Sequence, residues 1–121
     1  MSNSLFHEDS YYSLNNVSFK NIKTNSKAVM VFYQNDVDIN GMKVENIQCV
    51  GDIDKTSFLL FDSGEVFKTI NIKNLLVENS VSNGPFIIFK GEKININIKD
   101  SQLHNIKSYG SIMKNYSKQV Y

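Results

Sequence analysis

Apolar and polar residues alternate along this chain in a unit that occurs four times. Each unit opens with two apolar positions separated by one residue, passes a bend-tolerant residue, and continues with a second alternating pair. The four copies span residues 12–22, 37–47, 70–80 and 96–106. A period of two predicts strands with one buried face, because successive side chains of a strand point to opposite sides.

Two positions of the unit are polar in every copy. The fifth is always a residue that adopts a left-handed backbone at low cost, which predicts a shared bend. The tenth is always asparagine, whose side-chain amide can bond to its equivalent in the next copy and to turn backbone. The bend residues are Asn16, Gly41, Asn74 and Asp100, and the predicted structural ladder is Asn21, Asn46, Asn79 and Asn105.

A third apolar stretch follows each unit after a connector of variable length, and both of its alternating sets are apolar. The first set is Val29, Phe58, Phe86 and Ile112, and the second is Met30, Leu59, Ile87 and Met113. We expect one set to face outward, since strands buried on both faces show continuous apolar runs. The second set is therefore a candidate interaction strip, covered by further parts of a longer chain or by a protein partner.

Three strands per repeat, without helical periodicity between them, predict an all-β, right-handed parallel β-helix of about four coils. A leucine-rich repeat is the rival architecture, but it needs two residues between its last strand hydrophobe and its asparagine. Here only Glu45 separates Val44 from Asn46. We expect residues 1–11 to be the tail of a preceding coil, 12–113 to form the coils and 114–121 to start a further coil. The chain is then an uncapped fragment of a longer solenoid.

The repeated unit resembles the right-handed β-helix repeats of pectin-lyase-like proteins. The stretch Val17-Ser18-Phe19-Lys20-Asn21 is also similar to repeats of polymorphic outer-membrane and other surface proteins. The resemblance covers residues 12–113 and implies the fold, on which lyases, hydrolases, adhesins and spacers are all built. It also implies that catalytic members carry an arginine, and this chain has none.

Composition narrows the function further. The 121 residues suffice for one domain, and a net charge of +1 gives no electrostatic basis for binding nucleic acid. The single Cys49 excludes an intramolecular disulfide. No apolar run is long enough for a membrane-spanning helix, and the N-terminus lacks the pattern of a signal peptide. We expect a place outside the cell or on its surface as part of a longer protein, with a cytoplasmic location as the alternative.

The longest connector contains the one weak candidate for a metal site. Asp52 and Asp54 are two carboxylates one residue apart, which could take part in binding calcium. Solvated loop charges are the favoured interpretation, so no metal, cofactor or catalytic residue is expected.

The favoured hypothesis is a non-catalytic β-helix module of a larger surface, adhesion or structural protein. One alternative is the non-catalytic part of a polysaccharide lyase or glycoside hydrolase, and another is an intracellular interaction scaffold. Expected partners are further coils, a protein on the third strand, or carbohydrate. An isolated uncapped solenoid should also associate with itself through its open strand edges.

Overall fold

The computed structural model describes residues 11–25, 27–51, 56–108 and 110–120, and within them every regular element is a strand. The strands are β1 (Tyr11–Thr24), β2 (Ala28–Tyr33), β3 (Asp36–Cys49), β4 (Ser57–Asp62), β5 (Phe67–Ser82), β6 (Ile87–Lys90), β7 (Lys93–Lys99), β8 (Gln102–Ser108), β9 (Met113–Asn115) and β10 (Gln119–Val120).

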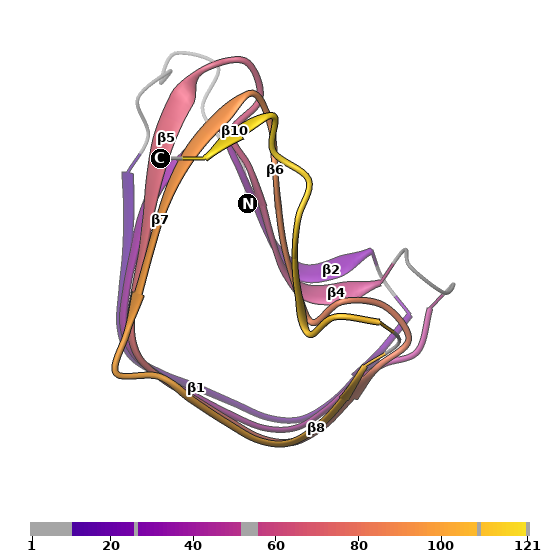
Figure 1. The fold of residues 1–121 in the computed structure, drawn as a ribbon. Coiled ribbons are helices and arrows are strands. Elements are labelled where there is room, and N and C mark those ends of the chain that lie inside the picture. The colour runs from indigo at the N-terminus through magenta and orange to yellow at the C-terminus, as the bar shows by residue number, and fades with distance from the viewer. Residues whose placement is uncertain (1–10, 26, 52–55, 109, 121) are drawn as a thin grey trace.

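All strand pairs are parallel and join equivalent residues of successive repeats. One sheet has the order β1-β3-β5-β7-β10, with β8 also pairing with β5, and the other has the order β2-β4-β6-β9. Val37, for example, lies between Tyr12 and Ile70. These pairings build a β-solenoid of about four turns, which confirms the predicted all-β repeat fold. Seen along the stack, the coils superimpose in a three-sided outline that is indented at β2 and β4 (Figure 1).

Each long strand turns two corners by means of a left-handed residue. The first corner has φ of 54° at Asn16 and 84° at Gly41, and its equivalents Asn74 and Asp100 also have positive φ. The second corner lies at the repeated asparagines, where φ is between 52° and 59°. Asn, Asp and Gly are the residues that adopt this conformation at least cost. The polar positions of the repeat therefore define the cross-section of the coil.

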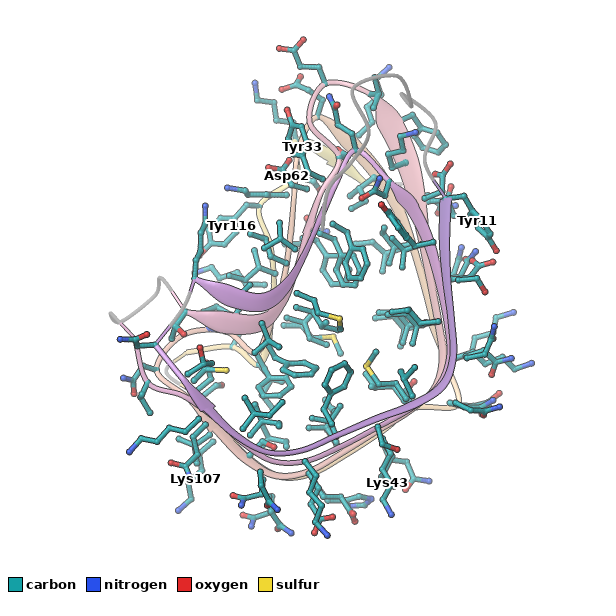
Figure 2. All side chains as sticks on the ribbon, turned by 180° about the vertical axis from the view of Figure 1, so that it is seen from behind. Tyr11, Tyr33, Lys43, Asp62, Lys107 and Tyr116 are labelled. Atoms are coloured by element: carbon teal, nitrogen blue, oxygen red, sulfur yellow. The ribbon has the colours of Figure 1, made fainter. Side chains whose placement is uncertain are left out.

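The inward columns of the middle coils form the core. Ile39 and Val44 of β3, with Ile72 and Val77 of β5, are among the side chains that lie almost completely buried. Figure 2 shows the interior of the coils filled with side chains made mostly of carbon, while labelled residues such as Lys43 point outward. Burying one such side chain stabilises the fold by about 1.5–3 kcal/mol, so the middle coils supply most of the hydrophobic stabilisation.

Stacked phenylalanines join the second sheet to the rest of the core. The rings of Phe32, Phe61 and Phe89 follow one another at 5.2 and 5.3 Å, with interplanar angles of 10° and 13°. Phe58 and Phe86 form a second stack at 5.1 Å. Such ring pairs contribute about 0.5–1.5 kcal/mol beyond the area that they bury. The sequence analysis had assigned these residues to apolar strands without recognising the stacks.

The candidate interaction strip faces the core instead of solvent. Leu59 and Ile87 are fully buried, while Met30 and Met113 are partly buried and pack against the core cluster. The cause is a bulge-like corner at the start of the second sheet. The amides of Phe58 and Leu59 both donate to the carbonyl oxygen of Phe86, at 2.8 and 3.2 Å.

Two adjacent amides that share one acceptor interrupt the alternation, so both side chains point inward. The same arrangement recurs one coil later, where the amides of Phe86 and Ile87 both donate to Ile112. The outward column is therefore Val31, Leu60, Ile88 and Lys114. Leu60 and Ile88 are only 3% and 9% exposed, whereas Val31 at one end of the column is 44% exposed, so the column is closed in its middle only.

The turns that connect the second sheet to the first are joined between coils by backbone hydrogen bonds. Ser63 N donates to Lys90 O at 2.9 Å, and Lys118 N donates to Gly91 O at 3.0 Å. Gly91 has φ of 123°, and a Cβ built on it would lie 2.0 Å from Ser63 Oγ. Only glycine combines this conformation with such a close approach.

We expect Gly91→Ala to lower the free energy of unfolding by about 3 kcal/mol or more, because backbone strain and a steric clash add. Gly110→Ala is the matched control: its φ is 80°, but nothing lies within 4 Å of the added Cβ. It should cost about 1–2 kcal/mol, from backbone strain alone. Urea denaturation of both variants measures the difference, and equal costs would contradict the close stacking of the turns.

Candidate functional site

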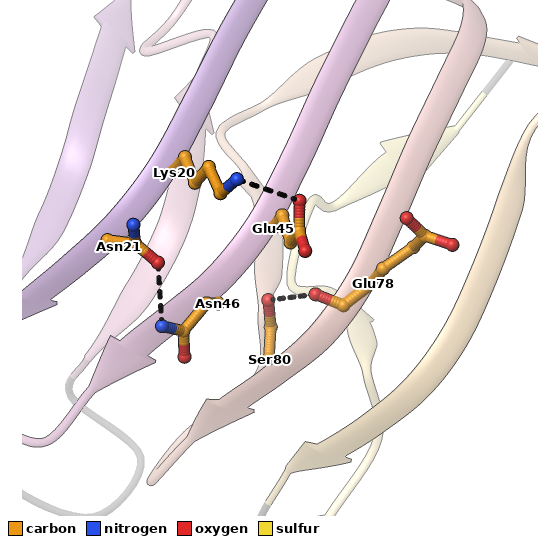
Figure 3. Close-up of polar contacts among 6 residues, drawn as sticks. All are labelled: Lys20, Asn21, Glu45, Asn46, Glu78 and Ser80. Atoms are coloured by element: carbon orange, nitrogen blue, oxygen red, sulfur yellow. Dashed lines mark hydrogen bonds and ion pairs between the residues drawn. The ribbon is translucent and has the colours of Figure 1, made fainter.

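The asparagine ladder lies on the outer surface at the second corner. Asn46 Nδ2 donates to Asn21 Oδ1 at 2.8 Å, and Asn105 Nδ2 donates to Asn79 Oδ1 at 2.8 Å. Figure 3 shows the first of these steps beside the ion pair of Lys20 with Glu45, which measures 3.9 Å. All four ladder side chains are exposed, so their contributions are the left-handed corner and the hydrogen bonds between coils.

The step between Asn46 and Asn79 is different, and Ser80 is the reason. Ser80 occupies a position that is isoleucine in the other three repeats. Its buried hydroxyl accepts from Ile47 N at 3.2 Å and donates to Glu78 O at 3.0 Å (Figure 3 draws the second bond). The Ser80 side chain thus takes part in hydrogen bonds with the backbone at this step. Among the described residues, no side-chain hydrogen bond joins Asn46 to Asn79.

A second polar column runs along the outward face of the first strands. Asn71 Nδ2 donates to Asp38 Oδ1 at 2.7 Å, and Asn97 Nδ2 donates to Asn71 Oδ1 at 2.8 Å. The hydroxyl of Tyr11 donates to the other carboxylate oxygen of Asp38. This hydrogen bond raises the pKa of Tyr11, which keeps the hydroxyl protonated as a donor. The column fixes the orientation of amides from successive coils.

Two shallow hollows adjoin this column. One, of about 380 Å³, is lined by Asn71, Ile72, Lys73, Asn97 and Lys99. The other, of about 260 Å³, is lined by Ser13, Asn15, Asp38, Ile39, Asn40, Asn71 and Lys73. Lys73 and Lys99 are exposed neighbours in register, and neither forms an ion pair within the described part of the chain. The face combines oriented amides with two ammonium groups that an anion could bridge.

Buried polar groups gather at the corner between the two sheets. Lys68 is 4% exposed and lies 3.9 Å from Asp36, whose other carboxylate oxygen accepts from Thr69 N at 2.8 Å. Asn35 is also buried, and its Nδ2 has no hydrogen-bond partner among the described residues. No pattern in the repeated unit predicts this cluster, because its members lie before or at the starts of β3 and β5, outside the repeated positions.

Cys49 lies inside the core and is chemically protected. Its side chain is fully buried, and desolvation raises the pKa of the thiol to about 11, although a hydrogen bond with Ser82 acts in the opposite direction. Because the thiolate is the reactive form, this cysteine is inert in the folded protein.

The weak metal candidates Asp52 and Asp54 lie outside the described residues. Within those residues, no three His, Cys, Asp or Glu side chains are grouped so that they could hold a metal ion. No helix in the same part of the chain is long and apolar enough to cross a membrane.

The two ends of the stack expose side chains that are buried in its middle. At one end Tyr12 and Leu14 are only partly buried, and at the other Ile98 is 36% exposed. Their equivalents in β3 and β5 are 0–1% exposed. A hollow of about 480 Å³ opens at the first end, lined by Tyr12, Leu14, Val29, Met30, Val31, Phe32, Tyr33 and Asn35. The ends are therefore apolar surfaces with the outline of a coil.

No model of a known protein family matches this chain, and no curated protein or solved structure is significantly similar to it. The repeated unit and the parallel solenoid identify the chain as a β-helix repeat.

Two substitutions of Asn46 separate its two contributions, the left-handed conformation at the corner and the hydrogen bond to Asn21. We expect Asn46→Gly to cost about 0.5–1.5 kcal/mol, because it removes the hydrogen bond to Asn21 while accepting φ of 56°. Asn46→Ala should cost about 1 kcal/mol more, because alanine is strained in this conformation. Urea denaturation tests both, with the exposed Lys43→Ala as a control that changes stability by about 0.5 kcal/mol or less. If alanine and glycine were equally destabilising, the corner would not depend on its left-handed residue.

Proposed function

We propose that this chain is a non-catalytic module of a β-solenoid, a rigid scaffold segment of a larger surface, adhesion or structural protein. One observation carries the proposal: both ends of the stack present the same apolar columns that its middle coils bury. Exposed core columns are stabilised by covering them with another layer of the same shape. The ends are thus suited to continue the solenoid.

The edges of the end strands support this proposal. Within the described residues, β1 and β2 each pair on one side only, with β3 and β4, and β8 and β9 likewise pair only with β5 and β6. Their free edges carry backbone donors and acceptors that a further parallel strand would satisfy. The repeat pattern favours the pectin-lyase-like and surface-protein class of solenoids, and with it a location outside the cell.

A tandem chain tests the module directly. Val120 pairs with Ile94, and Tyr11 is equivalent to Asn95, the residue after Ile94. If Val120 of one copy is followed directly by Tyr11 of a second, the join continues the coil in register. We expect this tandem to melt at a higher temperature than the single chain, because the joined coils bury two formerly exposed ends.

The control joins Val120 to Tyr12 and so shifts the second copy by one residue. A shift of one turns every inward side chain outward, and the gain in melting temperature should disappear. Thermal unfolding followed by circular dichroism compares the two tandems with the single chain. A tandem in register that melts no higher than the single chain would refute the module.

A second candidate function is the binding of an acidic carbohydrate on the outward face, favoured by the hollows beside Lys73 and Lys99. The two ammonium groups are adjacent in the stack at about 4.8 Å between strands, so carboxylates along an extended chain can bridge them. The amides of Asn71 and Asn97, two residues earlier on the same strands, are held beside the lysine pair by their hydrogen bond.

Polygalacturonate is a suitable probe, and affinity electrophoresis in a gel that contains it measures the retardation. We expect Lys73→Gln with Lys99→Gln to abolish most of the retardation, and Lys23→Gln with Lys107→Gln, on another face, to reduce it only slightly. Equal effects of both pairs would indicate attraction by net charge alone. The polymer should remain uncleaved, and release of reducing ends would contradict the non-catalytic proposal.

A further inference from the structure

We infer that the partner of the exposed ends is a second copy of this chain, stacked head to tail in register so that copies form one continuous solenoid. The inference rests on the proposed function and names the occupant of the ends. It follows from three independent features of the two end surfaces.

The first feature is the match of the apolar columns. If the register of the described coils continues across two copies, nearly every inward residue of the last coil meets an apolar residue of the first. The contacts would be Ile96 on Tyr12, Ile98 on Leu14, Leu103 on Phe19, Ile106 on Ile22, Ile112 on Val29 and Met113 on Met30. All twelve side chains are incompletely buried in the single chain. Stacking of copies would remove this apolar surface from water.

The second feature is the shape of the open edge. Among the described residues, β10 pairs with β7 only at Lys93 and Ile94, so no described strand pairs with this edge of β7 from Asn95 to Lys99. β1 begins at Tyr11, the equivalent of Asn95. β1 of a second copy therefore extends the pairing along β7 without overlapping β10.

The third feature is the polarity of the asparagine ladder. In both observed steps the later coil donates through Nδ2 and the earlier coil accepts through Oδ1. Among the described residues, Oδ1 of Asn105 accepts no ladder bond at one end of the stack, and Nδ2 of Asn21 donates none at the other. A second copy would add the next step of the ladder with the same direction.

A contact between two different surfaces does not close on itself unless the rotation closes a ring, so head-to-tail stacking produces open filaments. Wild-type chain should therefore sediment as species whose mass increases with protein concentration. A concentration-independent monomer would overturn the inference.

Two substitutions each block one end. Leu14→Lys introduces a charge at the first end, and Ile98→Lys introduces one at the last. Each variant alone should be monomeric, and an equimolar mixture should form dimers only, because each variant keeps one intact end. Val81→Lys is the control, since Val81 is 41% exposed on a lateral face, and it should associate like wild type. Self-association of either end variant alone, or loss of association in the control, would contradict head-to-tail stacking.

A crosslink tests the register and needs only exposed substitutions. Lys23 and Lys107 are equivalent, lie three coils apart within one chain and would be neighbours across two copies. Neighbouring strands are about 4.8 Å apart, within the range of a disulfide. Lys23→Cys with Lys107→Cys should give covalent oligomers on oxidation, whereas Lys20→Cys with Lys107→Cys, three residues out of register, should not. Cys49 is buried and does not compete.

The outcomes separate this inference from the module itself. Suppose that the tandem chain in register is stabilised, but separate copies stay monomeric and do not crosslink. The module is then supported, and a second copy of this chain is excluded as the partner of its ends. If the tandem chain gains no stability either, both proposals fail.

Discussion

Hydrogen bonding between equivalent residues of successive coils is the constraint on which the rest of this structure depends. Because every strand pair is parallel and in register, equivalent residues stack in columns along the solenoid, and most columns hold side chains of similar character. Apolar columns become the core, phenylalanines become stacks and amides become ladders. A coil can keep its register only if it turns at the same places as its neighbour. The left-handed residues at the two corners are therefore as important to the fold as its hydrophobic residues.

The same constraint explains where the chain departs from a perfect repeat. Insertions fall in the connectors, which lie outside the columns, so the spacing of equivalent asparagines can vary without disturbing the sheets. Ser80 is a polar residue inside an apolar column, and its hydroxyl is accommodated by hydrogen bonds with the backbone of Ile47 and Glu78. Gly91 shows the same for a turn, where close stacking on Ser63 leaves no space for a side chain.

The proposed module uses the surfaces that the stack leaves unsatisfied. The amides of the lateral face bond to one another in the polar column, and Leu60 and Ile88 are nearly closed in the middle of the outward column. The ends are different, because they expose apolar columns, free strand edges and ladder amides together. Since these three features match between opposite ends, the geometry that folds one coil onto the next can also join one copy to another.

The shape of the coil can be predicted from the sequence. Its period of two, the bend residues such as Gly41 and the repeated asparagines predicted a parallel all-β solenoid, because these signals are local and recur in every repeat. Tertiary structure alone decided the orientation of the third strand. Leu59 and Ile87 face inward because adjacent amides share one carbonyl of the next coil, and no alternation within a strand can reveal an acceptor in another. The phenylalanine stacks and the buried corner of Lys68 and Asn35 likewise depend on connectors of unequal length that align only when the coils stack.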